Sequence, residues 1–63
     1  MENKLKEQRL KAGLAQWQLA EKASVSRTII SQLENGSREI VTSETMRKIA
    51  EALNLSVKDI FLL

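Results

Sequence analysis

A chain of only 63 residues with neither cysteine nor histidine has to be held together by one small hydrophobic core. Chains this short lie near the lower limit for folding without a disulfide or a structural metal, and the usual ligands for both are absent here. The composition allows such a core, because 43% of the residues are hydrophobic and 29% are charged, as in folded globular domains. We therefore expect a single domain over residues 1–63 and no metal.

The apolar residues follow helical spacing rather than strand spacing. The chain has no proline and no sustained alternation of period two, and both of its glycines fall between helical segments. Five short helices are expected: one through Leu5, Arg9, Leu10 and Ala12 up to Gly13, a second over 16–23, a third from an N-cap at Ser26 to Asn35 and Gly36, a fourth from Thr42 or Ser43 to Asn54, and a last from a Ser56–Asp59 capping box through 60–63. Short turns between them predict a compact all-α bundle.

The third expected helix has two distinct faces. At about 100° per residue, its polar side chains fall in one arc: Arg27, Thr28, Ser31 and Gln32. Its apolar side chains fall in the opposite arc: Ile29, Ile30 and Leu33. The polar arc carries no carboxylate, and its guanidinium, hydroxyl and amide groups are those that bond base edges in the major groove. From the pattern alone, a solvated face and a base-reading face both stay open.

Residues 16–35 resemble the helix pair of the phage-repressor/Cro-type (lambda-repressor-like) helix-turn-helix regulators. Gln16 stands at the first position of that pair, Leu19 and Ala20 at its paired core positions, and "LENG" (33–36) closes its reading helix. The stretch "LKEQRLKAGL" is similar to the family's first helix and "TMRKIAEALNLSVKDIF" to its last two, so nearly the whole chain is covered. The resemblance implies a five-helix bundle whose second and third helices form the helix-turn-helix.

The resemblance also implies roles for individual residues. Base reading is implied for Arg27, Thr28, Ser31 and Gln32. Phosphate contacts, which fix register without reading sequence, are implied for Gln16, Asn35, Ser37 and Arg38. A structural ion pair is implied between Arg9 and Glu34, joining the first helix to the end of the third.

Several residues depart from the family's pattern. Ala15 stands where a Ser or Thr N-cap is common, which weakens the start of the second helix by about 1 kcal/mol. Ser24 replaces the turn glycine, so a non-glycine residue has to take a left-handed conformation. The loop that contains Ile40 and Val41 lacks the family's frequent proline, and these two residues face either inward or toward a partner. Trp17 stands where small or charged residues are usual, and packing on a neighbouring helix competes with a contact to DNA sugar or a partner.

The function expected from these features is that of a sequence-specific regulator that binds double-stranded DNA, most simply a homodimeric repressor reading a palindromic operator. The formal charge of +2 permits an anionic partner without requiring one. No catalysis and no cofactor are expected, because the chain has no histidine base, no metal-ligand cluster and no phosphate-cradling glycine loop. Two alternatives remain: an antitoxin or restriction-modification controller of the same family, and a protein-interaction module that has lost DNA binding.

The end of the chain is expected to form the dimer interface. The four consecutive apolar residues Ile60, Phe61, Leu62 and Leu63 are more than one face of a short helix can bury inside a thin bundle. The alternative is a helix that serves the core alone and has an apolar end. No apolar run approaches the roughly 18 residues of a membrane span, and the charged start "MENKLKEQR" is unlike a signal peptide, so the cytoplasm is the expected location and no membrane partner is expected.

Overall fold

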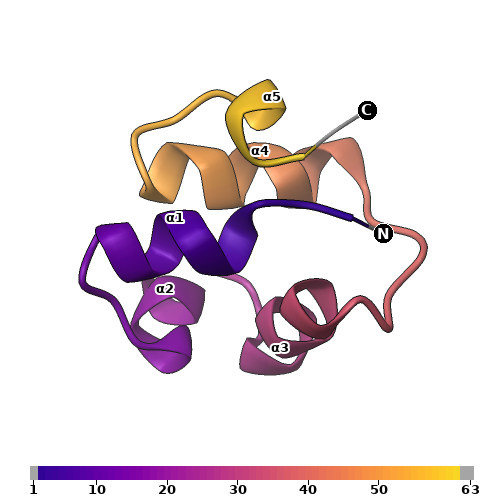
Figure 1. Ribbon diagram of the computed structural model, residues 1–63, viewed down its shortest axis with the longest axis horizontal. Helices are drawn as coiled ribbons and strands as arrows, with labels where there is room; N and C mark the ends of the chain where they lie inside the picture. Colours follow the sequence, from indigo (N-terminus) through magenta and orange to yellow (C-terminus); the bar gives the residue numbers. More distant parts are fainter. Residues whose placement is uncertain (1, 62–63) are drawn as a thin grey trace.

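Five helices account for most of residues 2–61, the part of the chain that the computed structural model describes (Figure 1). In chain order they are α1 (Leu5–Lys11), α2 (Gln16–Ala23), α3 (Arg27–Asn35), α4 (Ser43–Ala52) and α5 (Val57–Ile60). Between residues 2 and 61 the only extended pairing is an isolated antiparallel bridge between Asn3 and Phe61. The expected all-α, five-helix fold is confirmed.

The helix boundaries follow from local chemistry. The hydroxyls of Ser26 and Thr42 each accept a hydrogen bond from the backbone N–H three residues on, at 3.2 and 3.1 Å, and so cap α3 and α4. Gly36 and Asn54 follow the same two helices in the left-handed conformation, with φ of 78° and 57°. Ser24, in the turn between α2 and α3, has φ 58° and ψ 41°, so the left-handed serine expected there is confirmed.

One core draws side chains from all five helices. Its largest fully buried side chains are Leu5, Leu19, Ile30, Leu33, Ile49, Ile60 and Phe61. α2 packs against α3 and α4, α4 packs against α5, and α1 packs against α3. Because Ile30 and Leu33 are both buried, the rotation of α3 about its axis is fixed, and its opposite face is turned outward.

The end of the chain differs from the prediction. α5 ends at Ile60, and Phe61 is extended, with φ −103° and ψ 118°. The N-terminal segment, indigo in Figure 1, runs alongside it: the Lys4 N–H donates to the Ile60 carbonyl at 2.7 Å, and Asn3 bridges to Phe61. Ile60 and Phe61 are therefore 0% and 1% exposed, and the expectation that they form a dimer surface is wrong. Leu62 and Leu63, predicted for the same surface, lie outside the described residues.

Four other apolar residues are placed by the structure. Leu10, expected on the inward face of the first helix, is 58% exposed, because only Leu5 and Arg9 on that short helix face the core. In the loop before α4, Val41 packs against the core while Ile40 is 81% exposed. Trp17 is 54% exposed on α2, so packing on a neighbouring helix does not cover it.

Candidate nucleic-acid interface

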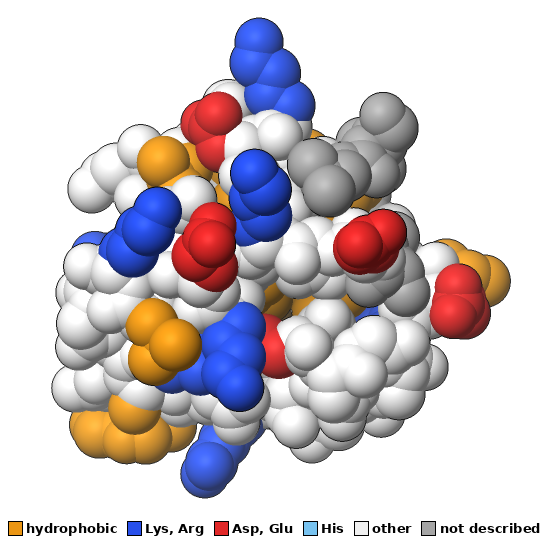
Figure 2. All heavy atoms as spheres, in the orientation of Figure 1, with side chains coloured by type: hydrophobic (Ala, Val, Ile, Leu, Met, Phe, Trp, Pro, Cys, Tyr) orange, Lys and Arg blue, Asp and Glu red, His pale blue; other side chains and the backbone are white. Residues whose placement is uncertain are grey.

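The outward face of α3 carries the four residues expected to read bases. Arg27 and Thr28 are exposed, and Ser31 and Gln32 are half-buried. In Figure 2 the surface over α3, at the lower right, is predominantly white, whereas blue and red side chains mingle over the rest of this view. The face is thus polar but nearly without charge, apart from Arg27 at its N-terminal end.

Two adjoining hollows lie along this face. The first, of about 300 Å³, is lined by Gln16, Arg27, Thr28, Ser31 and Gln32. The second, of about 260 Å³, is lined by Lys6, Arg9, Gln16, Ser31, Glu34 and Asn35. Gln16 and Ser31 line both. The structure therefore brings the four predicted reading residues together with Gln16 and Asn35, which the resemblance assigns to phosphate.

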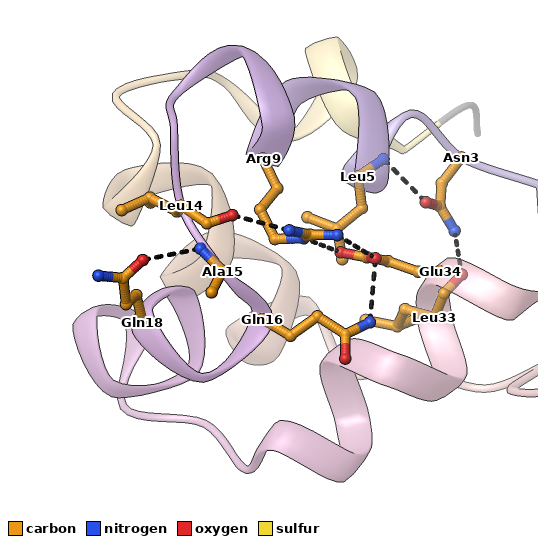
Figure 3. Close-up of polar contacts among 9 residues, drawn as sticks. All are labelled: Asn3, Leu5, Arg9, Leu14, Ala15, Gln16, Gln18, Leu33 and Glu34. Carbon is orange, nitrogen blue, oxygen red and sulfur yellow. Dashed lines mark hydrogen bonds and ion pairs between the residues drawn. The ribbon is translucent and has the colours of Figure 1, made fainter.

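An ion pair between Arg9 and Glu34 joins α1 to α3 (Figure 3). The guanidinium binds the carboxylate as a fork, Nε to Oε2 at 2.6 Å and Nη2 to Oε1 at 3.0 Å, and its Nη1 donates to the Leu14 carbonyl at 2.7 Å. The two side chains are only 9% and 4% exposed. Hydrogen bonding to Glu34 raises the pKa of Arg9, against the opposing effect of burial. The pair implied by the resemblance is present.

The same carboxylate also holds Gln16. The Nε2 of Gln16 donates to Glu34 Oε1 at 3.1 Å, and this bond links the start of α2 to the ion pair. Because a carboxylate only accepts hydrogen bonds, the amide nitrogen has to face Glu34, and the amide oxygen points away, as Figure 3 shows. An amide nitrogen carries two hydrogens, so one donor of Gln16 remains for another acceptor such as a phosphate oxygen.

The start of α2 offers further donors. Its N-cap, Ala15, has no side-chain oxygen to accept from the first turn, although the Ala15 N–H itself donates to Gln18 Oε1 at 2.8 Å. The first backbone N–H groups of a helix have no partner within it, and the helix dipole favours an anion beside them. This end of α2 is therefore suited to a phosphate, and the missing cap leaves its donors to an outside acceptor.

The segment after α3 folds back on the reading helix. The N–H groups of Ser37 and Arg38 both donate to the Gln32 carbonyl, at 3.1 and 3.3 Å, and Asn35 Oδ1 accepts from the Ser37 N–H at 2.9 Å. The Arg38 guanidinium reaches the Gln32 side chain, with Nε to Oε1 at 3.0 Å. Arg38, predicted as a phosphate contact, is thus bound to a predicted reading residue.

Two residues of this region were not predicted from the sequence. Lys6 lines the second hollow beside Gln16 and Asn35, and its spacing of three from Arg9 on α1 placed both on one helical face. Asn3 links the N-terminal segment to α3: its Oδ1 accepts from the Leu5 N–H at 2.9 Å, and its Nδ2 donates to the Leu33 carbonyl at 3.0 Å. No sequence pattern pointed to Asn3.

Within residues 2–61, no group of three or more His, Cys, Asp or Glu side chains is placed to hold a metal ion. Nor does that part of the chain contain a helix with the length and apolar character needed to cross a membrane.

A short helix that braces a second helix, whose polar and carboxylate-free face is turned outward, defines the helix-turn-helix class of DNA-binding domains. A comparison with protein families matches residues 5–60 to the helix-turn-helix family, and the chain belongs to that family. It is a family of DNA-binding regulators that typically have no enzymatic activity. Searches of curated proteins and of solved structures give no match.

Proposed function

We propose that the protein is a homodimeric repressor that reads a palindromic operator with α3 in the major groove. The observation that supports this most strongly is the outward, carboxylate-free face of α3, where Arg27, Thr28, Ser31 and Gln32 lie together beside Gln16. The major groove, about 12 Å wide, admits a helix. The groups on this face match base edges: a guanidinium fork for guanine, the methyl group of Thr28 for thymine, and hydroxyls that bond either donors or acceptors on the bases.

Phosphate contacts around α3 hold it in register. They come from Gln16 and the backbone N–H groups of the first turn of α2, with Lys6 nearby. The exposed Asn35, which lines the same hollow as Gln16 and Lys6, and the exposed Ser37 add contacts at the end of α3. Such contacts orient a reading helix without selecting a sequence. The arrangement lets α2 cross the backbone while α3 enters the groove.

The homodimer is proposed from the size of the footprint. The domain measures 24 × 22 × 19 Å, so one copy spans a single half-site, whereas half-sites in palindromic operators lie about 34 Å apart. Two copies related by a two-fold axis double the number of base contacts. Because Ile60 and Phe61 belong to the core, they are not assigned to the contact between the copies.

Selection of bound sites from random duplex DNA tests the proposal. We expect an inverted repeat with half-site centres about 10 base pairs apart, bound more weakly as salt rises. Failure to enrich any sequence, or binding that does not respond to salt, would contradict DNA reading and favour an interaction module.

The repressor role needs a separate experiment. The selected site is placed over a reporter promoter, and transcription is measured with and without the protein. We expect transcription to fall with the parent and to recover with Arg27→Ala, because occlusion of the promoter requires binding to the site. A rise in transcription would show an activator and would leave the DNA-binding proposal intact.

A further inference from the structure

Arg38 is attached to Gln32 at two points. Gly36, in the left-handed conformation, turns the chain back over the last turn of α3, and there the Arg38 N–H donates to the Gln32 carbonyl at 3.3 Å. The Arg38 guanidinium then donates through Nε to Gln32 Oε1 at 3.0 Å. Both side chains are half-buried. This holds the Gln32 amide from a neighbouring loop, beside the hollow where the reading residues meet.

The chemistry of this contact fixes which way round the Gln32 amide lies. A guanidinium has donors only, so the Gln32 atom that faces it has to be the amide oxygen. The two N–H donors of Nε2 then lie on the other side of the amide group, which Arg38 does not contact. A cation on the carbonyl oxygen also polarises the amide, which strengthens its N–H groups as donors and weakens the oxygen as an acceptor for a second partner.

A donor-biased glutamine discriminates between purines. To read adenine as a pair of bonds, glutamine donates to N7 and must also accept from the N6 amino group through Oε1. Guanine presents two acceptors, N7 and O6, in the same positions. With Oε1 already bound to Arg38, the second bond to adenine is weakened, whereas donation to guanine is strengthened.

We propose that Arg38 is a positioning residue for sequence specificity: it holds Gln32 as a hydrogen-bond donor, so that the base pair read by Gln32 presents guanine rather than adenine. This inference rests on the proposed DNA-reading function. The expected preference for guanine over adenine at that base pair is on the order of tenfold, the scale of one base-edge hydrogen bond.

Site selection with four variants tests the inference. Gln32→Ala identifies the base pair, which is the one whose preference it removes. At that pair we expect guanine with the parent, a shift of about tenfold toward adenine with Arg38→Ala, and retention of guanine with Arg38→Lys, whose ammonium still donates to Oε1. Arg47→Ala is the matched control: it removes the same charge from α4, where Arg47 pairs with Glu51 at 2.9 Å, and should leave every position unchanged.

The effect of Arg38 should also depend on Gln32. In the Gln32→Ala background, Arg38→Ala should cause no further change at this base pair, because the coupling passes through the amide. Without DNA, the side-chain amide NMR signals of Gln32 should move in Arg38→Ala and stay in place in Arg47→Ala. The same spectra show whether each variant is folded. If Arg38→Ala is not, Arg38→Met carries the test, because it keeps an aliphatic side chain and has no donor for Gln32 Oε1.

Three results would overturn the inference. One is adenine at this position with the parent protein. Another is Arg38→Ala weakening all sequences equally with guanine retained, which would mark Arg38 as a phosphate contact. The third is unmoved Gln32 amide signals in a folded Arg38→Ala variant. Each of these leaves the proposed function standing, whereas failure of the parent to enrich any sequence would remove the proposed function and this inference together.

Discussion

At the scale of single residues, Arg9 neutralises the carboxylate of Glu34, which would otherwise repel anions at the proposed phosphate-binding surface. Glu34 lines the same hollow as Gln16 and Asn35, which are proposed to face phosphates. The fork from Arg9 cancels its charge, and the pair is nearly buried. The carboxylate can then act as an acceptor for Gln16 without repelling DNA. One ion pair thus supports both the packing of α1 on α3 and the charge of the interface.

Substitution of Arg9 should therefore destabilise the fold strongly. We expect Arg9→Ala to lower the free energy of unfolding by about 3–5 kcal/mol, because it leaves a buried carboxylate unpaired. Urea denaturation followed by circular dichroism measures this. The double variant Arg9→Met/Glu34→Leu is the control: replacing a buried pair by apolar residues is often nearly neutral. If the double variant were as unstable as the single one, the loss would come from packing rather than from the unpaired charge.

Arg27 should act on sequence preference. It stands exposed at the N-terminal end of α3, in the hollow with Thr28 and Gln32. We expect Arg27→Ala to weaken specific binding by about 1–3 kcal/mol and to relax the preference at one base pair in each half-site, because a guanidinium fork on guanine is lost. Site selection with the variant checks this. An unchanged site preference would remove Arg27 from the reading residues.

Gln16 should act differently, since a phosphate contact carries no sequence information. We expect Gln16→Ala to weaken binding to the selected site and to scrambled DNA by about the same factor. Gel shifts on the two duplexes at one salt concentration give the ratio. A change in the preferred sequence would place Gln16 among the reading residues instead.

At the scale of secondary-structure elements, α2 begins without an N-cap hydroxyl. Ser26 and Thr42 cap α3 and α4 with a hydroxyl, whereas Ala15 has none to offer. Ala15 already has the extended conformation of an N-cap, with φ −75° and ψ 163°. A serine at this position therefore needs no change of backbone to accept a hydrogen bond from the first turn.

We expect Ala15→Ser to raise the free energy of unfolding by about 0.5–2 kcal/mol, the usual worth of an N-cap hydroxyl. Thermal and urea denaturation measure the gain. Ala15→Val is the matched control, because valine is no better than alanine at an N-cap. Equal stabilities of the serine and valine variants would show that the first turn of α2 gains nothing from a cap.

How far the sequence predicted these elements depends on where their causes lie. The local pattern predicted where α3 and α4 begin and that α3 stops at Gly36, because the residues that cause these boundaries lie at the boundaries themselves. The Arg9–Glu34 pair spans 25 positions and came from the family resemblance. The end of α5 was mispredicted because the N-terminal segment, far away in sequence, pairs with Phe61. The contact of Arg38 with Gln32 depends on how a loop folds back, which no periodicity describes.

At the scale of the whole molecule, the two ends of the described chain close the core together. The bridge between Asn3 and Phe61 forms directly after the end of α5, and Asn3 also donates to the end of α3. Phe61 is among the largest fully buried side chains of the molecule. A domain of this size has little stability to spare. Its fold, and with it the rotation of α3, therefore depends on a residue near the C-terminal end of the chain.

Phe61→Ala separates a core role from a role in dimerisation. We expect it to lower the free energy of unfolding by about 3–5 kcal/mol, the usual cost of removing a buried phenylalanine. If Phe61 serves the core of each copy, this loss is the same at every protein concentration. If it formed the contact between copies, the parent's advantage would grow with concentration, because association stabilises the folded state by mass action. Urea denaturation of the parent and of Phe61→Ala, at two protein concentrations about a hundredfold apart, distinguishes these two roles. If the difference in stability between parent and variant depended on protein concentration, Phe61 would belong to the contact between copies.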